Sequence, residues 1–484
     1  MEQLNKRKIC IGFYLFVLAT FFVVTNSDST SPFFLQKHLD SNIFQYMGYI
    51  ITEGKIPYTD YFDHKGLLLY FFNALGILIN KTWGIHLLQC LYMTLVLATW
   101  YKGLVMVKSQ TVRLLIMPLS LVCLYHCYSL GNLTEDWSLL FISIPITLYL
   151  RRINDKQTTF SILDELIIGL CIGSVLMIRL NNIFPMMGVP VFCAYLAIKE
   201  KRYKYLFQSV LIISLGAIIP VSLCSTYMYI IGGQKGIEDM WFANITFNFE
   251  YNNGYVQPYN LEWVRFIYKS LLPIPFLLLP CVKDNKYRMP LLLGFLFTLL
   301  TIGKTHFFHY LIVFVPLVIY SVGIINNKCR VLLMSCIVLF NVKTFYNQFS
   351  IEHFTRRKDN SAYEMKRLLS FIPQNDRDKV WSYNGAFILP EQIQNNLLQT
   401  NRIFLNSRLD LTKELQYSEM NKICQERPKY VLYPIYSEQW MNGHAKYSGA
   451  EKDENFLKEN YSVLSSVTLD DGTKVYCYKL RETK

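Results

Sequence analysis

The sequence predicts an all-α polytopic membrane protein that ends in a small extracytoplasmic α/β domain. Of its 484 residues, 52% are hydrophobic and only 17% are charged, which is too little polar surface for a water-soluble protein of this length. The hydrophobic residues gather in runs of about 15 to 25, the length that crosses a bilayer as a helix. Residues 350–484, by contrast, contain segments in which apolar and polar residues alternate as they do in β-strands.

The apolar runs predict about eleven membrane-spanning helices. Their approximate ranges are 8–25, 84–101, 112–128, 136–150, 163–180, 183–198, 205–231, 265–282, 288–303, 307–325 and 330–347. The first run is long and has no small-x-small cleavage pattern before Asn26 and Ser27. We therefore expect an uncleaved anchor in place of a signal peptide.

Lysine and arginine residues form six short clusters between these apolar runs. The clusters are Lys6, Arg7 and Lys8; Lys102, Lys108 and Arg113; Arg151, Arg152 and Lys156; Lys199, Lys201, Arg202 and Lys204; Lys283, Lys286 and Arg288; and Lys328 and Arg330. The positive-inside rule assigns all six to the cytoplasm, together with the N-terminus. The net charge of +13 therefore reflects membrane topology, and its distribution argues against a nucleic-acid partner.

One apolar segment, 66–79, is only about 14 residues long, a length more typical of an interfacial helix than of a crossing. If it crossed the bilayer, the basic clusters that follow it would change sides. As an interfacial helix it leaves every cluster in the cytoplasm. The sequence therefore predicts a transmembrane domain over 1–349, with a long first outer loop at 26–83, and an extracytoplasmic domain over 350–484.

The C-terminal domain is expected to contain a small sheet. Its strand-like segments are 379–383, 429–435 and 474–480. The DDGT turn at 470–473 precedes the last of them and predicts a β-hairpin at the end of the chain. Cys424 and Cys477 lie in this domain, where either a disulfide or two unpaired thiols is compatible with the sequence.

The first outer loop carries a dense group of charged residues just before the interfacial segment. They are Asp40, Asp60, Asp63, His64 and Lys65. One interpretation is a solvated loop with turn residues at Pro57 and Asp60. The other is a functional site, because charge held at the depth of the membrane surface is costly and usually serves a function. A carboxylate can accept a proton from a nucleophile, and a cation can stabilise a departing phosphate.

The loop resembles that of the membrane glycosyltransferases with the C-type fold (GT-C), which include protein O-mannosyltransferases and the lipid A aminoarabinose transferase. In that family an acidic residue follows the first span, then a G-x-x-P-Y-like turn, then an aromatic and acidic run ending in Lys before a juxtamembrane helix. Asp40, GKIPY at 54–58, YFDHKG at 61–66 and the segment 66–79 are similar to these parts. Many members have two adjacent acids where this chain has Asp40 and Ser41, which argues against a metal bridged by both.

The resemblance implies a transferase that moves a sugar from a polyprenyl-phosphate donor to a glycan, lipid or protein acceptor at the outer face of the membrane. It implies that Asp40 is the base that takes the acceptor's proton, and that Lys65 contacts the carrier phosphate. Asp60, Asp63 and His64 are expected to support them. No cofactor is implied, and a divalent metal bound in another way stays compatible with the sequence.

Two other functions are compatible with the same outer-face residues. A carrier or flippase for lipid-linked saccharides would use basic and aromatic groups for binding alone, and a polymerase would join lipid-linked repeat units. Transporters usually contain inverted repeats and helices broken near the midplane, which this sequence does not clearly contain. We therefore expect an enzyme.

Glu135 lies in the GNLTED turn at 131–136 and is similar to a family position, an acidic residue in the outer loop two spans later. The alternative is a structural role in the first turn of a helix that is capped by Asn132 or Thr134. Both interpretations place Glu135 at the outer end of a span.

Three further residues lie at predicted outer helix ends. Arg179 follows an apolar run, where its side chain would either snorkel to water or meet the carrier phosphate. Lys304 and His309 lie in the GKTHFFH turn and are expected to support the site. For His309 the alternative is a hydrogen-bonded residue of a helix interface.

Overall fold

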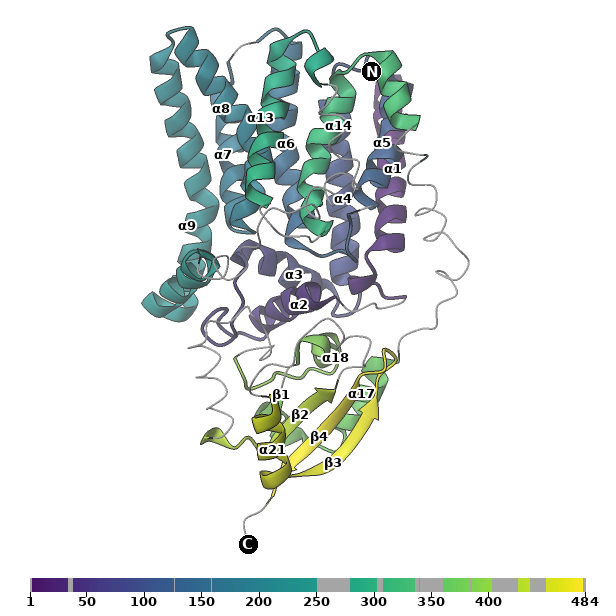
Figure 1. Cartoon of the computed structure of the whole chain (residues 1–484), viewed down its shortest axis with the longest axis vertical. Helices are drawn as coiled ribbons and strands as arrows, with labels where there is room; N and C mark the ends of the chain where they lie inside the picture. Colours follow the sequence, from purple (N-terminus) through teal and green to yellow (C-terminus); the bar gives the residue numbers. More distant parts are fainter. Residues whose placement is uncertain are drawn as a thin grey trace.

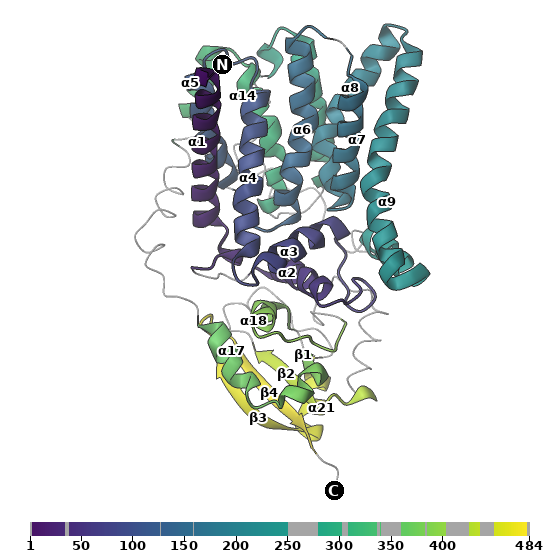
Figure 2. The same cartoon turned by 180° about the vertical axis from the view of Figure 1, so that it is seen from behind.

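The computed structural model describes residues 2–33, 38–125, 127–157, 159–249, 279–302, 308–335, 339, 360–382, 385–402, 425–435 and 450–481. Figure 1 shows a bundle of long helices at one end of the molecule and a small sheet at the other. Two shorter helices, α2 (Leu39–Thr52) and α3 (Leu67–Ile79), lie across the bundle axis between them. The view from behind in Figure 2 has the same three layers.

The bundle helices coincide with predicted spans. They are α1 (Glu2–Asn26), α4 (Gly84–Gly103), α5 (Gln110–Tyr125), α6 (Thr134–Asn154), α7 (Ile162–Leu176), α8 (Phe184–Lys199), α9 (Tyr203–Trp241), α13 (Asn285–Ile302) and α14 (Val315–Ile324). Within the described residues, four helical segments are long and apolar enough to cross a membrane: Lys6–Asn26, Gly84–Gly103, Leu180–Lys199 and Tyr203–Phe249. The chain is thus a helical membrane protein. The predicted number of crossings stays a prediction, because 265–282 and 330–347 fall largely outside the described residues.

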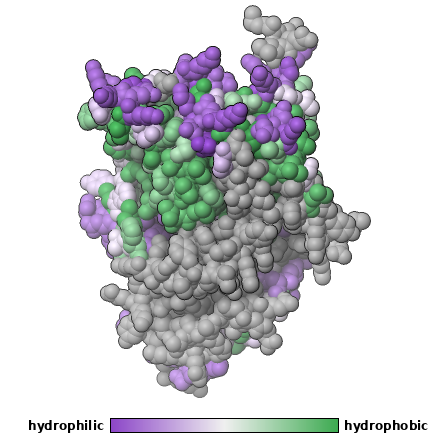
Figure 3. Space-filling model, turned by 45° about the horizontal axis from the view of Figure 1, so that its top comes forward, coloured by the Kyte–Doolittle hydropathy of each residue, from purple (hydrophilic) through white to green (hydrophobic). Residues whose placement is uncertain are grey.

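The outer surface of the bundle is apolar. On α9, Phe207 is 72% exposed, Leu223 is 67% exposed and Ile230 is 75% exposed, as expected for side chains that face lipid. Figure 3 shows hydrophilic side chains gathered at the end of the bundle away from the sheet, with hydrophobic side chains below them. The helix ends and turns on this side of the bundle carry the six basic clusters. Their common position is what the predicted topology requires, and the compartment that they face stays a prediction.

Two predicted elements differ from the structure. The predicted span 205–231 is too short, because α9 continues to Trp241 with a kink at Gly233, whose combination of φ 61° and ψ −154° only glycine adopts readily. The predicted span 307–325 begins as a 3-10 helix, η5 (Phe308–Phe314), and becomes α-helical only from Val315, with Pro316 in the first turn of α14.

The helices α2 and α3 pack closely against each other at the end of the bundle near the sheet. A side-chain carbon at Gly48 of α2 would lie 2.6 Å from the backbone nitrogen of Ala74 in α3, closer than atoms can approach. Only glycine permits this contact. The pair is thereby held as one layer between the bundle and the sheet (Figure 1).

The C-terminal part contains a four-stranded sheet in the order β1-β2-β4-β3. Its strands are β1 (Val380–Ser382), β2 (Tyr430–Ile435), β3 (Tyr461–Thr468) and β4 (Lys474–Leu480). The strands β1 and β2 are parallel, and the other pairs are antiparallel. The predicted strands and the predicted hairpin are confirmed.

The two helices α17 (Ser361–Leu369) and α21 (Ala450–Asn460) pack with this sheet. Met365, Leu368 and Cys477 belong to a buried cluster that joins α17 to the strands. The thiol of Cys477 is unpaired, and burial raises its pKa to about 12. Cys424 lies outside the described residues. The alternative of a bond between the two cysteines is therefore not supported.

Candidate functional site

Asp40 lies in the first turn of α2 and is half-buried. The residues beside it bind this end of α2 to the bundle. Ser41 Oγ donates to Ser29 Oγ at 2.9 Å, and Gln45 Nε2 donates to the backbone oxygen of Ser29 at 2.9 Å. Ser29 belongs to the turn that follows α1. The position of Asp40 is therefore set by hydrogen bonds between α2 and the turn that follows the first span.

The GNLTED turn also contacts α2 beside Asp40, through Asn132. Asn132, with a left-handed φ of 61°, donates to Ser41 Oγ at 3.0 Å and to Asn73 Oδ1 at 2.9 Å. Trp137 Nε1 donates to Asn132 Oδ1 at 2.9 Å. Asn132 thus joins the start of α6 to both α2 and α3.

The prediction that Asn132 or Thr134 caps the start of α6 is wrong. The residue before α6 is Leu133, and its N–H donates to Asp136 Oδ2 at 2.9 Å. The Asp136 carboxylate therefore accepts a backbone N–H at the start of the helix. Neither Asn132 nor Thr134 caps the helix through its side chain. Asn132 is engaged by α2 and α3 instead. Glu135 does lie in the first turn, as that interpretation required, and its side chain is buried.

Glu135 forms an ion pair with Arg179, which follows the end of α7. The side chains of Arg179 and Glu135 are 19% and 2% exposed. Arg179 also donates to Thr134 Oγ1 at 3.3 Å, and its guanidinium lies 4.3 Å from the ring centre of Tyr310. Arg179 is therefore held by a carboxylate and an aromatic ring, and it does not snorkel into water. Whether it meets a phosphate stays a prediction.

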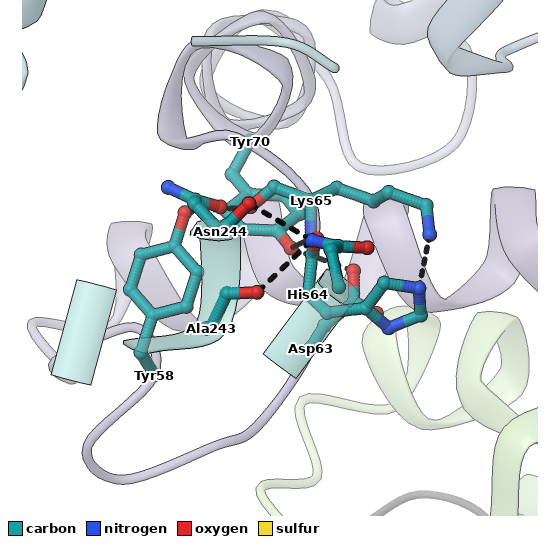
Figure 4. A network of polar contacts seen from close by, with 8 residues as sticks. Tyr58, Asp63, His64, Lys65, Tyr70, Ala243 and Asn244 are labelled. Carbon is teal, nitrogen blue, oxygen red and sulfur yellow. Dashed lines mark hydrogen bonds and ion pairs between the residues drawn. The ribbon is translucent and has the colours of Figure 1, made fainter. Parts of the chain in front are cut away.

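The run Asp63, His64 and Lys65 forms a network of polar contacts (Figure 4). Tyr70 donates its hydroxyl proton to Asp63 Oδ2 at 2.6 Å, and His64 Nδ1 lies 3.6 Å from Asp63 Oδ1. Lys65 Nζ contacts His64 Nε2 on the far side of the ring. Burial raises the pKa of Asp63, although Lys65 and Tyr70 each lower it. The four side chains thus form a chain of contacts from α3 to the Lys65 ammonium.

The GKIPY turn at 54–58 holds the backbone of Lys65, which belongs to this network. Tyr58 has a left-handed φ of 65°, which is rare for a large side chain, and its hydroxyl donates to the backbone oxygen of Lys65 at 2.8 Å. Asp60 has a separate role, because its exposed carboxylate accepts from the backbone N–H of Ile56 at 2.8 Å and closes the turn. Asp60 is therefore a turn residue in the structure.

A backbone junction brings Lys65 close to Arg179. Gly66 N–H donates to the oxygen of Ile178 at 3.0 Å, and Leu68 N–H donates to the oxygen of Met177 at 2.9 Å. A side-chain carbon at Gly66 would lie 2.1 Å from the Met177 oxygen, so only glycine permits the junction. Lys65 directly precedes Gly66, and Arg179 directly follows Ile178, so the two residues lie beside this pair of hydrogen bonds.

Asp40 interacts electrostatically with the groups around it. They are Asp63, Arg179, His309 and Tyr310. His309 is buried, and its ring lies edge-on to that of His38 with 6.3 Å between the ring centres. The structure therefore gathers most of the predicted site around the start of α2: Asp40, Asp63, His64, Lys65, Glu135, Arg179 and His309.

The remaining predicted site residue, Lys304, lies outside the described residues. The sequence interpretation did not include His38, Tyr70 and Tyr310. Tyrosines are frequent at membrane surfaces, so their type alone gave no signal. Within the part of the chain that the structure describes, no three His, Cys, Asp or Glu side chains are grouped so that they could hold a metal ion.

No protein-family model matches this sequence, and no curated protein matches it. Solved structures do match the fold. The crystal structure of an oligosaccharyltransferase from Archaeoglobus fulgidus, tethered by a disulfide bond to an acceptor peptide with the NVT sequon, matches with a TM-score of 0.50 and 12% identity. The match covers 96% of this chain and 74% of that one. The fold is similar to that of this oligosaccharyltransferase.

A second structure of the A. fulgidus enzyme, in complex with an inhibitory peptide and a dolichol-phosphate, has a TM-score of 0.47 and 14% identity over 97% of this chain and 74% of that one. At such identities the likeness concerns the fold alone. The expectation of a C-type glycosyltransferase fold is supported at that level. The finer resemblance to O-mannosyltransferases and to the aminoarabinose transferase stays a prediction.

Proposed function

We propose that the chain is a glycosyltransferase that moves a sugar from a polyprenyl-phosphate donor to an acceptor at the outer face of the membrane. The observation that carries the proposal is the grouping at the start of α2. There the Asp40 carboxylate interacts with the Arg179 guanidinium. The backbone hydrogen bond between Gly66 and Ile178 joins the chain next to Lys65 to the chain next to Arg179. A base and two cations are the groups that this transfer requires.

In the proposed reaction, an acceptor hydroxyl attacks the anomeric carbon of the donor sugar from the face opposite the phosphate. Asp40 takes the hydroxyl proton as the new glycosidic bond forms. The bond between the anomeric carbon and the phosphate oxygen breaks, and the polyprenyl phosphate leaves with the electron pair. Attack opposite to the leaving group inverts the anomeric configuration. No further reactant is needed.

Asp40 is better suited to the role of base than Asp63. The Asp63 carboxylate is buried and already accepts a hydrogen bond from Tyr70 at 2.6 Å. Asp40 is half-buried at the end of its helix, so an acceptor can approach it more easily. Asp63 then serves to hold His64 and, through it, the ammonium of Lys65.

Lys65 and Arg179 are the proposed ligands of the donor phosphate. Each is already oriented by a neighbour: Lys65 by His64, and Arg179 by Glu135 and Tyr310. Cations that are held in place before the reaction stabilise a developing phosphate charge without reorganisation. His309 and Lys304 are proposed to support the same region.

The test is transfer of radiolabelled sugar from a synthetic polyprenyl-phosphate sugar by the purified full-length chain in detergent. The matched structure carries an acceptor peptide, so peptide, glycan and lipid acceptors should each be tried. Transfer by the wild type and its loss in Asp40→Asn would support the proposal. Donor binding without cleavage would reject it in favour of a carrier.

A further inference from the structure

A segment of the C-terminal part, residues 385–402, lies against α2 on the side away from the bundle (Figures 1 and 2). It contains η7 (Gly385–Phe387) and α18 (Leu389–Gln394). Asn42 of α2 donates to the backbone oxygen of Ala386 at 3.3 Å. The segment therefore begins its contact with α2 only two residues after Asp40.

Tyr46, one helical turn beyond Asn42, makes the central contact with this segment. Its hydroxyl donates to the backbone oxygen of Leu397 at 3.3 Å and accepts from the Gln399 N–H at 2.9 Å. Its side chain is 0% exposed. Asn42 and Tyr46 thus share the face of α2 that meets the C-terminal segment, whereas Ser41 and Gln45 hold the neighbouring face to the bundle. The helix that carries Asp40 is fixed from both sides.

The same segment also binds the loop that leads to Lys65. Phe62 N–H donates to the backbone oxygen of Arg402 at 2.9 Å, and Arg402 Nη2 donates to the backbone oxygen of Tyr58 at 2.7 Å. Tyr61 donates its hydroxyl proton to the oxygen of Gln399 at 2.5 Å. Because Tyr58 in turn holds the backbone of Lys65, the contacts run without a break from Arg402 to the site.

We propose that residues 385–402 are a positioning element of the transfer site. In this proposal Tyr46 acts as a positioning residue for Asp40, and Arg402 acts as a positioning residue for Lys65. Neither residue touches the reacting atoms. The inference rests on the proposed function for its effect on catalysis, but the contacts themselves are independent of any substrate.

The two positioning residues, Tyr46 and Arg402, should have different kinetic effects when they are replaced. Tyr46→Phe removes the hydroxyl that holds α2, so kcat should fall by about tenfold or more while KM for the donor changes little, because small displacements of a reacting group are costly. Arg402→Gln should chiefly raise KM for the donor, because it releases the loop that carries Lys65. Arg402→Lys, which keeps a donor for the oxygen of Tyr58, should recover much of the loss.

Tyr49→Phe is the matched control for the Tyr46 variant. Tyr49 lies on the same helix and is 1% exposed, but its hydroxyl interacts with Glu53 instead of the C-terminal segment. The kcat of the Tyr49→Phe variant should equal that of the wild type. Equal losses in Tyr46→Phe and Tyr49→Phe would overturn the proposed role of Tyr46. A donor KM that is unchanged in Arg402→Gln would overturn the role of Arg402.

Hydrogen–deuterium exchange separates this inference from the proposed function. The amides of residues 58–66 should exchange faster in Arg402→Gln, and those of α2 should exchange faster in Tyr46→Phe. If the wild type transfers no sugar from the phosphate-linked donor, the proposed function fails while the exchange still tests the scaffold. Exchange that stays at the wild-type rate in both variants would overturn the positioning element whatever the activity.

Discussion

Arg179 and Glu135 form an ion pair between the turn after α7 and the first turn of α6. Both side chains are removed from water, and Glu135 is almost completely so. A buried charge that loses its partner destabilises a fold strongly, because neither water nor another ion replaces that partner. The pair therefore has a structural role that is separable from any role of Arg179 in binding phosphate.

Glu135→Gln tests this structural role. We expect the variant to lose about 3 kcal/mol of stability, because it removes the ion-paired carboxylate from a guanidinium that is largely withdrawn from water. Thermal unfolding in detergent measures the loss. Glu53→Gln is the control, because Glu53 pairs with Lys81 at 3.3 Å on the surface, where such a pair contributes at most about 1 kcal/mol. Equal effects of the two changes would show that the Arg179 pair is no different from a surface pair.

Lys65→Met should weaken catalysis without unfolding the protein. A preorganised cation contributes on the order of 3 kcal/mol to a transition state with developing phosphate charge, so transfer should slow by roughly a hundredfold or more. Steady-state rates with the phosphate-linked donor measure the effect. Lys55→Met removes an exposed lysine of the same loop and should leave the rate unchanged. A Lys65→Met rate near that of the wild type would exclude Lys65 from stabilising the departing phosphate.

Asp63 should make the stability depend on pH. Burial raises its pKa above the ordinary value of 3.8, so the folded protein binds more protons at this group than the unfolded chain does. Its contribution to stability is therefore fully present below pH 3.8 and is lost as the pH rises through the raised pKa. Asp63→Asn keeps an acceptor for Tyr70 and should remove this dependence.

Melting temperatures in detergent, measured from about pH 4 to about pH 7, compare the two proteins across this window. The difference between wild type and Asp63→Asn should grow in favour of the variant as the pH rises. Parallel curves would mean that the Asp63 carboxyl titrates in the same way in the folded and unfolded chains.

The bundle was predictable because the bilayer imposes a simple rule on sequence. A lipid-facing helix must be apolar over its whole length, so α1, α4 and α9 are visible as runs of residues. The local hairpin of β3 and β4 was equally visible from its turn and its alternation. The continuation of α9 beyond residue 231 was not, because Gly232 and Gly233 look like a helix end in sequence, whereas the left-handed φ of Gly233 makes a kink instead.

The contacts within the site were predictable only where its residues are close in sequence. Asp63, His64 and Lys65 are consecutive, and their grouping followed from the chain itself. The partner of Arg179 did not, since a contact between the starts and ends of different helices depends on how the bundle packs. For the same reason nothing in the sequence indicated that Tyr46 would bind Leu397 and Gln399.

Cysteine labelling tests the topology. Cys10 is the exposed thiol among the cysteines whose burial the structure describes, so the background replaces Cys10 by Ser together with Cys281, Cys336 and Cys424. In this background Gln157→Cys should resist an impermeant maleimide in intact cells, whereas Lys366→Cys of α17 should react. The reason is that the basic clusters retain their end of the bundle in the cytoplasm. Permeabilised cells provide the control, in which both should react. Labelling of Gln157→Cys in intact cells would invert the protein and place the proposed site on the wrong side.

Asp40→Asn should abolish transfer while donor binding and folding persist. The amide keeps the shape of the carboxylate and its place in the first turn of α2, but it cannot accept a proton from the acceptor. Single-turnover transfer and donor binding, measured on the same preparation, separate the two effects. Asp60→Asn is the matched control, because Asp60 closes the turn at Ile56 and the amide oxygen can still accept that bond. Full activity in a correctly folded Asp40→Asn protein would transfer the role of base to Asp63 or Glu135.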